Sequence, residues 1–280
     1  MKIVNTTHVF PAEWDICNML DRMKNCGFDT LDFCFLDYTQ TPEFQNDHEN
    51  WAHFIREEAD KRGICFTHAH ASFWLLEEAK KAEKTFQVAS ILGVTKMVSH
   101  PNVNDWSKEK PGDVPYQHPY PAEEFIRLNA QSVKPLLELA EKYGVMILSE
   151  NLLWGESAQA TVQSDFVEYV NSPWFGWCYD VGHAIHTGDP LESLLKCKYP
   201  PVSLHTHDCL GKGEEDHYIP GDGVLDWKKF ARILKEIGYT GDLVLEAMRQ
   251  TRKADDKDRD TILRKLYRRA KTILDDYEQL

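Results

Sequence analysis

The chain has 280 residues, 42% of them hydrophobic, which is enough to bury a sizeable core and suits one large α/β domain. Its formal net charge of −13 disfavours a nucleic-acid partner, because an acidic surface repels a phosphate backbone. No apolar run approaches the roughly 20 residues of a membrane span, and the first ten residues, MKIVNTTHVF, lack the apolar core of a signal peptide.

Cysteine usage indicates a reducing compartment. The seven cysteines lie at positions 17, 26, 34, 65, 178, 197 and 209, and no two of them form a C-x-x-C pair. An odd, scattered set in a chain of this length is typical of reduced core thiols rather than of a disulfide framework. We therefore expect a cytoplasmic protein with one domain, residues 1–280, and no membrane segment.

Short β-rich runs alternate with longer amphipathic runs along the whole chain, which is typical of βα units and a parallel sheet. Eight strands are predicted, at Lys2–Val4, Thr30–Phe35, Ile64–Thr67, Lys96–Ser99, Met146–Ser149, Phe175–Tyr179, Val202–Thr206 and Asp242–Leu245. A helix that ends at a glycine and leads into a strand recurs in KNCGFDTLDF, ADKRGICFTH, ASILGVTKMV, AEKYGVMILS and KEIGYTGDLVLE.

The last predicted helix covers Asp258–Tyr277. Its apolar face consists of Ile262, Leu266, Ala270, Ile273 and Tyr277. Eight βα units in this length predict a (β/α)8 TIM barrel, in which functional groups lie at the C-terminal ends of the strands. A doubly wound open sheet is less favoured, because no Gly-rich phosphate loop follows the first strand.

Side chains that bind metals or move protons follow six of the predicted strands. They are His68 and His70, His100, Glu150, Asp180 and His183, His205 to Asp208, and Glu246. A buried carboxylate is costly unless a cation or hydrogen bonds compensate its charge, so several acids and imidazoles at one barrel mouth indicate a cation. Carboxylates and imidazoles without a thiolate suit Mn²⁺, Mg²⁺, Co²⁺ or Zn²⁺.

Five segments carry a family resemblance over nearly the whole chain: LSEN (148–151), YDVGH (179–183), LHTHD (204–208), DHYIPGDGVLDW (216–227) and LVLEA (243–247). In this order and spacing the chain resembles the xylose isomerase-like barrel superfamily. That superfamily contains sugar isomerases, ketose 3-epimerases, inosose-processing enzymes and endonuclease IV-type enzymes that act at apurinic sites.

The resemblance implies one divalent ion, with Mn²⁺ as the first choice, held by Glu150, Asp180, His205 and Glu246. His207 is a rival for His205, because residues two apart on a strand point to the same side. We prefer His205, because the ligand of the superfamily usually stands three residues before an acidic residue, here Asp208.

The resemblance also implies a mechanism for isomerisation or epimerisation of a small sugar or sugar phosphate, as part of carbohydrate metabolism. Glu150 and Glu246 would remove and return a proton next to a carbonyl, and His183 would donate a hydrogen bond to the developing oxyanion. Relatives are often dimers or tetramers, so the resemblance also implies a homo-oligomer.

Aromatic and basic residues near the strand ends are candidates for substrate binding. The loop Pro101–Tyr120 carries Trp106 and is a candidate lid, and Trp154 could stack on a sugar ring. Arg249 could bind a phosphate, a carboxylate or substrate hydroxyls. Ketose 3-epimerases that resemble the chain tend to carry an arginine six residues after the histidine ligand, where this chain has Gly211.

A multi-zinc hydrolase or lyase, including an endonuclease IV-type phosphodiesterase, is the main alternative. His70, His100, Glu215 and His217, with the residues named above, stand where the endonucleases place zinc ligands, and His207 is a further candidate ligand or substrate contact. The net charge and the acidic segment GKGEEDH disfavour DNA as the substrate. A carbohydrate sensor without catalytic activity is a third alternative, which the retention of both glutamates disfavours.

Overall fold

The computed structural model describes residues 1–11, 15–75, 79–110, 113–213 and 217–280. Its strands are β1 (Ile3–Thr6), β2 (Thr30–Cys34), β3 (Cys65–His70), β4 (Lys96–Ser99), β5 (Met146–Glu150), β6 (Phe175–Asp180), β7 (Ser203–His205) and β8 (Leu243–Leu245). Every predicted strand overlaps one of them, with bounds that differ by at most three residues.

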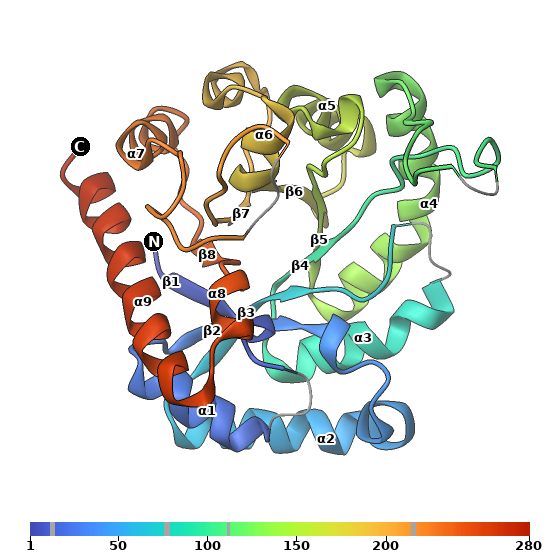
Figure 1. Ribbon diagram of the computed structural model, residues 1–280. Helices are drawn as coiled ribbons and strands as arrows, with labels where there is room; N and C mark the ends of the chain where they lie inside the picture. The colour runs from blue at the N-terminus through green and yellow to red at the C-terminus, as the bar shows by residue number, and fades with distance from the viewer. Residues whose placement is uncertain (12–14, 76–78, 111–112, 214–216) are drawn as a thin grey trace.

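The strands form one parallel sheet in the order β7-β6-β5-β4-β3-β2-β1-β8. A single bridge between Thr206 and Leu245 joins the two outer strands β7 and β8. The sheet therefore curls into a nearly closed barrel, and helices surround the strands (Figure 1). The predicted (β/α)8 TIM barrel is confirmed.

The helices are α1 (Ile16–Asn25), α2 (Pro42–Lys61), α3 (Ala79–Leu92), α4 (Ala122–Tyr143), α5 (Ala160–Val170), α6 (Val181–Thr187), α7 (Trp227–Glu236), α8 (Arg249–Lys253) and α9 (Asp256–Glu278). Short 3₁₀ helices are η1 (Thr7–Val9), η2 (Phe35–Asp37), η3 (Glu156–Ala158) and η4 (Leu191–Lys196). No helix among the described residues is long and apolar enough to cross a membrane.

The repeated helix–glycine–strand pattern has the conformation that its sequence predicts. The five glycines that end it, Gly27, Gly63, Gly93, Gly144 and Gly238, all have positive φ. At the end of α4, for example, Gly144 takes the left-handed conformation, and its N–H donates to the carbonyl of Ala140. A side chain with a Cβ atom adopts this conformation only at a cost, which explains the glycine.

Helix α9 begins two residues earlier and ends one residue later than the sequence predicts, and its buried face differs in part. Leu266, Ala270 and Ile273 are buried as expected, whereas Ile262 and Tyr277 are only partly buried. Leu263 and Arg259 are buried instead. The burial of Arg259 is compensated because its guanidinium donates to the backbone carbonyls of Thr251 in α8 and Ala254 at the end of that helix.

Candidate metal centre

Four side chains predicted to share a cation converge at the C-terminal ends of β5 to β8. One ligand atom from each of Glu150, Asp180, His205 and Glu246 lies within 4.8 Å of the corresponding atoms of the other three. The sheet register brings two of them together, because Asp180 lies beside His205 in the β6–β7 pair. Glu150 ends β5, and Glu246 follows β8.

Two of the carboxylates lie deep in the barrel, and hydrogen bonds hold one of them, Asp180, in place. Glu150 and Asp180 are almost completely buried. Asp180 is also the N-cap of α6, where its Oδ1 accepts a hydrogen bond of 2.7 Å from the N–H of His183. Asn151 binds both backbone groups of Asp180: Oδ1 accepts from its N–H at 2.8 Å and Nδ2 donates to its carbonyl at 2.9 Å.

His205 lies between the two glutamates. Its Nδ1 is 2.8 Å from Oε1 of Glu150 and 3.3 Å from Oε2 of Glu246. Burial alone would raise the pKa of Glu150, but the facing imidazoles of His205, His100 and His70 outweigh it and hold that pKa well below its usual range. The pKa of Glu246 is lowered against the effect of burial by His205 and His217. Both glutamates therefore stay ionised and concentrate negative charge at one point.

One oxygen of Glu150 indicates that this donor set fits a cation. Its Oε2 is buried and accepts no hydrogen bond from the described residues, although Nε2 of His100 lies 3.2 Å away. A buried carboxylate oxygen without a hydrogen bond is costly unless a positive charge faces it. Three carboxylates and one imidazole are ligands that suit Mn²⁺, Mg²⁺, Co²⁺ or Zn²⁺, so the residues fit the expected divalent ion.

His70 and His100 form a second group with Glu150, and their ligand atoms also lie within 4.8 Å of one another. The two Nε2 atoms are only 3.1 Å apart, and Nδ1 of His70 is 3.0 Å from the carbonyl of Ala71. The carbonyl can only accept, so in a neutral His70 the proton is on Nδ1 and the lone pair of Nε2 points toward His100 and Glu150. This arrangement also suits a cation.

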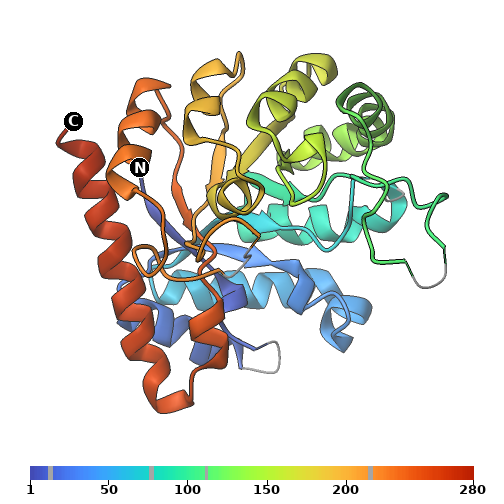
Figure 2. The ribbon, with the colours of Figure 1, turned by 45° about the horizontal axis from the view of Figure 1, so that its top comes forward.

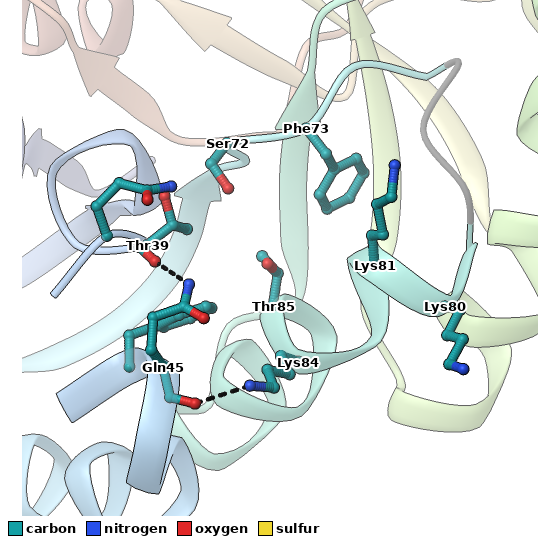
Figure 3. Close-up of a pocket in the computed structure, with 10 residues that line it drawn as sticks. Thr39, Gln45, Ser72, Phe73, Lys80, Lys81, Lys84 and Thr85 are labelled. Atoms are coloured by element: carbon teal, nitrogen blue, oxygen red, sulfur yellow. Dashed lines mark hydrogen bonds between the residues drawn. The ribbon is translucent and has the colours of Figure 1, made fainter. Parts of the chain in front are cut away.

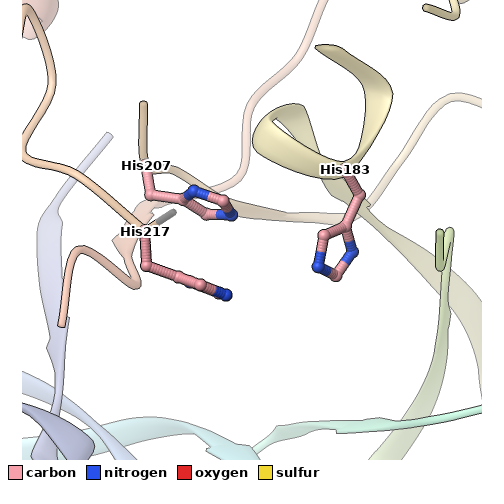
Figure 4. A group of neighbouring side chains, drawn as sticks. All are labelled: His183, His207 and His217. Atoms are coloured by element: carbon pink, nitrogen blue, oxygen red, sulfur yellow. The ribbon is translucent and has the colours of Figure 1, made fainter. Parts of the chain in front are cut away.

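A third group consists of His183, His207 and His217. Figure 4 shows His183 on α6 across from His207 and His217, whose rings lie face to face. Nδ1 of His183 is 2.9 Å from the carbonyl of Asn151, and Nδ1 of His217 is 3.0 Å from the carbonyl of Glu246. These carbonyls fix the orientation of both rings with Nδ1 as donor.

The three predicted substrate-binding residues each contact another side chain of the chain. Trp154 stacks on Tyr116 with ring centres 3.6 Å apart, which covers one face of its indole. The Trp106 indole donates to Oδ1 of Asn102, and Arg249 lies over the ring of Tyr218. Glu215, a candidate ligand from the sequence, lies outside the described residues.

The described part of the candidate lid, residues 101–110 and 113–120, projects from the side of the barrel in both ribbon views (Figure 2). Its base is well connected: Asn104 and Pro119 form an antiparallel bridge, and the N–H of Tyr120 donates to the carbonyl of Val103. Asn129 on α4 binds both the N–H and the carbonyl of Asn102. These contacts join the two ends of the loop to each other and tie one of them to α4.

Further side chains at the ends of the strands contact the histidines described above or one another. Trp74 packs edge-on against His100, with ring centres 5.5 Å apart. His8, which follows β1, contacts Asp37, which follows β2, at 2.6 Å, and Arg252 of α8 lies beside both. Functional groups of a barrel lie at the C-terminal ends of its strands, and the same rule applied to the first two strands would also have found His8 and Asp37.

A separate cavity of about 410 Å³ lies between α2 and α3 and does not include the four-ligand group. Its lining includes Lys80, Lys81 and Lys84 (Figure 3). The three ammonium groups point in different directions, and that of Lys84 donates to the carbonyl of Gln45. The lysines therefore do not converge on one anion.

Comparison with protein families gives a match over residues 20–271 to the family described as "Xylose isomerase-like TIM barrel". An uncharacterised protein of Methanocaldococcus jannaschii is 28% identical over 49% of this chain and 48% of its own length. An inosose dehydratase of Klebsiella pneumoniae is 30% identical over 45% of this chain and 48% of its own length. In both relatives the match thus spans about half of the protein. An inosose isomerase of Bacillus velezensis is 23% identical over 82% of each chain.

Two solved structures share the fold over almost the full length. A D-psicose 3-epimerase determined in the presence of D-fructose aligns with a TM-score of 0.74 and 16% identity, covering 98% of this chain and 99% of the epimerase. The IOLI protein with a bound zinc atom aligns with a TM-score of 0.71 and 18% identity, covering 100% of this chain and 99% of that protein.

Proposed function

The chain belongs to the xylose isomerase-like TIM barrel family, and on that premise we propose that it is a divalent-metal-dependent sugar isomerase or epimerase. The observation that carries the proposal is the pair of glutamates on either side of His205. Glu150 and Glu246 approach the same ring nitrogen at 2.8 and 3.3 Å, and their ligand atoms lie within 4.8 Å of each other and of Asp180.

Glu150, Asp180, His205 and Glu246 would hold one ion, with Mn²⁺ as our first choice; the structural neighbour IOLI carries zinc. When bound, the ion would polarise a substrate carbonyl and stabilise the negative charge of an enediolate. One glutamate would take a proton from the carbon next to that carbonyl, and the other would return a proton. Return to the opposite face of the same carbon is epimerisation, and return to the former carbonyl carbon is isomerisation.

His183 would donate a hydrogen bond to an oxyanion only in one protonation state. Its Nδ1 is held by the carbonyl of Asn151 at 2.9 Å, so donation from Nε2 to an oxyanion requires protons on both ring nitrogens. A neutral His183 would instead accept a hydrogen bond from a substrate hydroxyl. The two states predict opposite contacts, with an oxyanion or with a hydroxyl group.

The names of the relatives suggest the substrate class. Psicose is a ketose and inosose is a cyclic ketone, and each has a carbonyl next to a carbon that bears a hydroxyl and a hydrogen. We propose a ketose or a keto-cyclitol as the substrate of this chain, with or without a phosphate. We also propose that residues 1–280 act as one domain and in the cytoplasm, as chain length and cysteine usage indicate, and in a homo-oligomer, as the family resemblance implies.

The proposal is tested by solvent isotope exchange in D₂O. The protein, loaded with Mn²⁺, is incubated with a panel of ketoses and inososes, and deuterium on the carbon next to the carbonyl is measured by NMR. Glu150→Gln and Glu246→Gln should each abolish product formation, because one proton-transfer group is lost in each. Glu168→Gln, on the exposed surface of α5, is the matched control and should leave turnover unchanged. If the wild type forms product without taking up deuterium, proton transfer by a group that exchanges its proton with the solvent is excluded.

The second candidate function is a multi-metal hydrolase or lyase. The specific observation in its favour is that His70, His100 and Glu150 form a separate group, in which two ring nitrogens and an unpartnered carboxylate oxygen face one another. Elemental mass spectrometry of protein purified without chelator separates the two functions. One ion per chain supports the isomerase or epimerase, whereas two or three zinc ions, with hydrolysis of bis(4-nitrophenyl) phosphate, support the hydrolase.

A further inference from the structure

His207 is completely buried and lies two residues past His205, the residue at which β7 ends. Its Nε2 is 3.0 Å from Oδ1 and 3.1 Å from Oδ2 of Asp180. Because an ionised carboxylate can only accept hydrogen bonds, Nε2 of His207 is assigned as the protonated ring nitrogen and donates a hydrogen bond to Asp180. A protonated Nε2 has no lone pair for a metal, and the other ring nitrogen, Nδ1, lies 3.4 Å from the carbonyl of Asp208.

The ring of His207 also supports a second histidine. His207 and His217 stack with ring centres 3.9 Å apart and planes inclined by 21° (Figure 4). Among the described residues, His217 is one of three other than glycine with positive φ, at +45°. The stack and the hydrogen bond from Nδ1 to the carbonyl of Glu246 hold this ring in place.

The chain makes room for His207 at one specific position. A Cβ atom on Gly182 would lie 1.9 Å from Cε1 of the His207 ring and 2.5 Å from its Nε2. Gly182 is in the first turn of α6, directly after Asp180 and Val181. Glycine is therefore required there for His207 to reach the carboxylate of Asp180.

We propose that His207 is a positioning residue of the metal centre and not a metal ligand. Through Nε2–H it orients the carboxylate of Asp180, and through its ring face it orients His217, while Gly182 provides the space for both contacts. The inference rests on the proposed function only in taking Asp180 as a ligand of the divalent ion. It is tested by metal binding, so a failure to find a sugar substrate does not affect it.

The experiment measures Mn²⁺ and Co²⁺ affinity by competition with a chromophoric chelator, the number of ions per chain, and the visible spectrum of the Co²⁺ form. His207→Phe keeps a ring against His217 but loses the donor, and metal affinity should fall about 10- to 100-fold, as is typical for loss of such a supporting contact. His207→Gln keeps an N–H toward Asp180, and its affinity should stay within about threefold of the wild type. The number of ions per chain should not change in either variant.

His186→Phe, on the same helix α6 but outside the three histidine and carboxylate groups, is the matched control and should not change the affinity. Gly182→Ala should weaken binding about as much as His207→Phe, because its Cβ displaces the ring. In a His207→Ala background the same glycine substitution should cost less than about threefold, because the clash is gone.

Equal affinities of His207→Phe and wild type would overturn the proposal and leave His207 as a packing residue. The loss of one ion per chain in both His207→Phe and His207→Gln would overturn it in favour of a ligand role. A wild type that binds no divalent ion would overturn both this inference and the proposed function, whereas metal binding without sugar turnover would overturn only the latter.

Discussion

Replacing Asp208 by asparagine should destabilise the segment that carries His217. The buried carboxylate of Asp208 accepts four hydrogen bonds from N–H donors: Oδ1 from the backbone of Cys209 at 3.1 Å and Leu225 at 3.2 Å, and Oδ2 from the backbone of Gly221 at 2.9 Å and the indole of Trp227 at 2.9 Å. One side chain therefore holds four described positions between the end of β7 and the start of α7.

The magnitude follows from the number of donors. An asparagine keeps one acceptor oxygen, so two of the four bonds are lost and its NH₂ group faces two N–H donors in either orientation. A hydrogen bond to a charged group contributes about 1.5–3 kcal/mol, so we expect a loss of about 3–6 kcal/mol. Such a loss is a large part of the roughly 5–15 kcal/mol that stabilises a typical folded protein.

Urea denaturation followed by tryptophan fluorescence measures the change in the free energy of unfolding, and limited proteolysis within 209–227 reports local opening of the loop. Asp226→Asn is the matched control: it changes the same residue type in the same loop, but Asp226 is the N-cap of α7, where asparagine caps equally well. A loss below about 1 kcal/mol for Asp208→Asn, with unchanged proteolysis, would refute the reasoning.

Three further predictions concern the centre and the strands below it. Removing the divalent ion with a chelator should lower the melting temperature of the wild type but not of Glu246→Gln, since an ion present at 1,000 times its Kd adds about 4 kcal/mol to stability; equal shifts in both proteins would count against the four-ligand site. Asn151→Asp should cost about 3 kcal/mol in urea denaturation, because a carboxylate oxygen would replace the donor that lies 2.9 Å from the carbonyl of Asp180. Burial lowers the pKa of His68 to about 3, so the folded state keeps this ring neutral while the unfolded chain takes up a proton below about pH 6.5. Stability should therefore fall with decreasing pH by up to about 1.4 kcal/mol per pH unit in the wild type and less steeply in His68→Asn; parallel slopes between pH 7 and pH 5 would show that His68 is not the cause.

The sequence is sufficient to predict the barrel because each βα unit carries its own local signals. The glycines that end the helices take positive φ as expected, and every predicted strand overlaps an observed one. The strand-end rule also brought together Glu150, Asp180, His205 and Glu246, because parallel strands of a barrel all end at the same face.

The relation between His205 and His207 could not be predicted in the same way. The period of two places both side chains on one side of a strand, but β7 ends at His205 and the regular alternation ends with it. His205 faces Glu150, whereas His207 contacts Asp180 and packs against Gly182 in the first turn of α6. That difference depends on the space left by a glycine 25 positions away in the sequence, which no local pattern encodes.

The stacking partners of the aromatic residues could likewise not be predicted from the sequence. We expect Trp154 to stack on a sugar ring and Trp106 to bind substrate; Tyr116 covers one face of Trp154, and Trp74 packs edge-on against His100. Which aromatic side chain faces the barrel axis depends on loop conformation, and a loop of this length has no periodicity from which to predict it.

The closure of the barrel between β7 and β8 has a consequence for its dynamics. These strands have three residues each, and they are joined by the N–H groups of Thr206 and Glu246 in the bridge at Thr206. His205 ends β7 and Glu246 follows β8, so an ion held by both would link these two strands. Slow amide hydrogen–deuterium exchange at Thr206 and Glu246 would then depend on the ion, while the amides within the β5–β6 pair would stay protected with or without it.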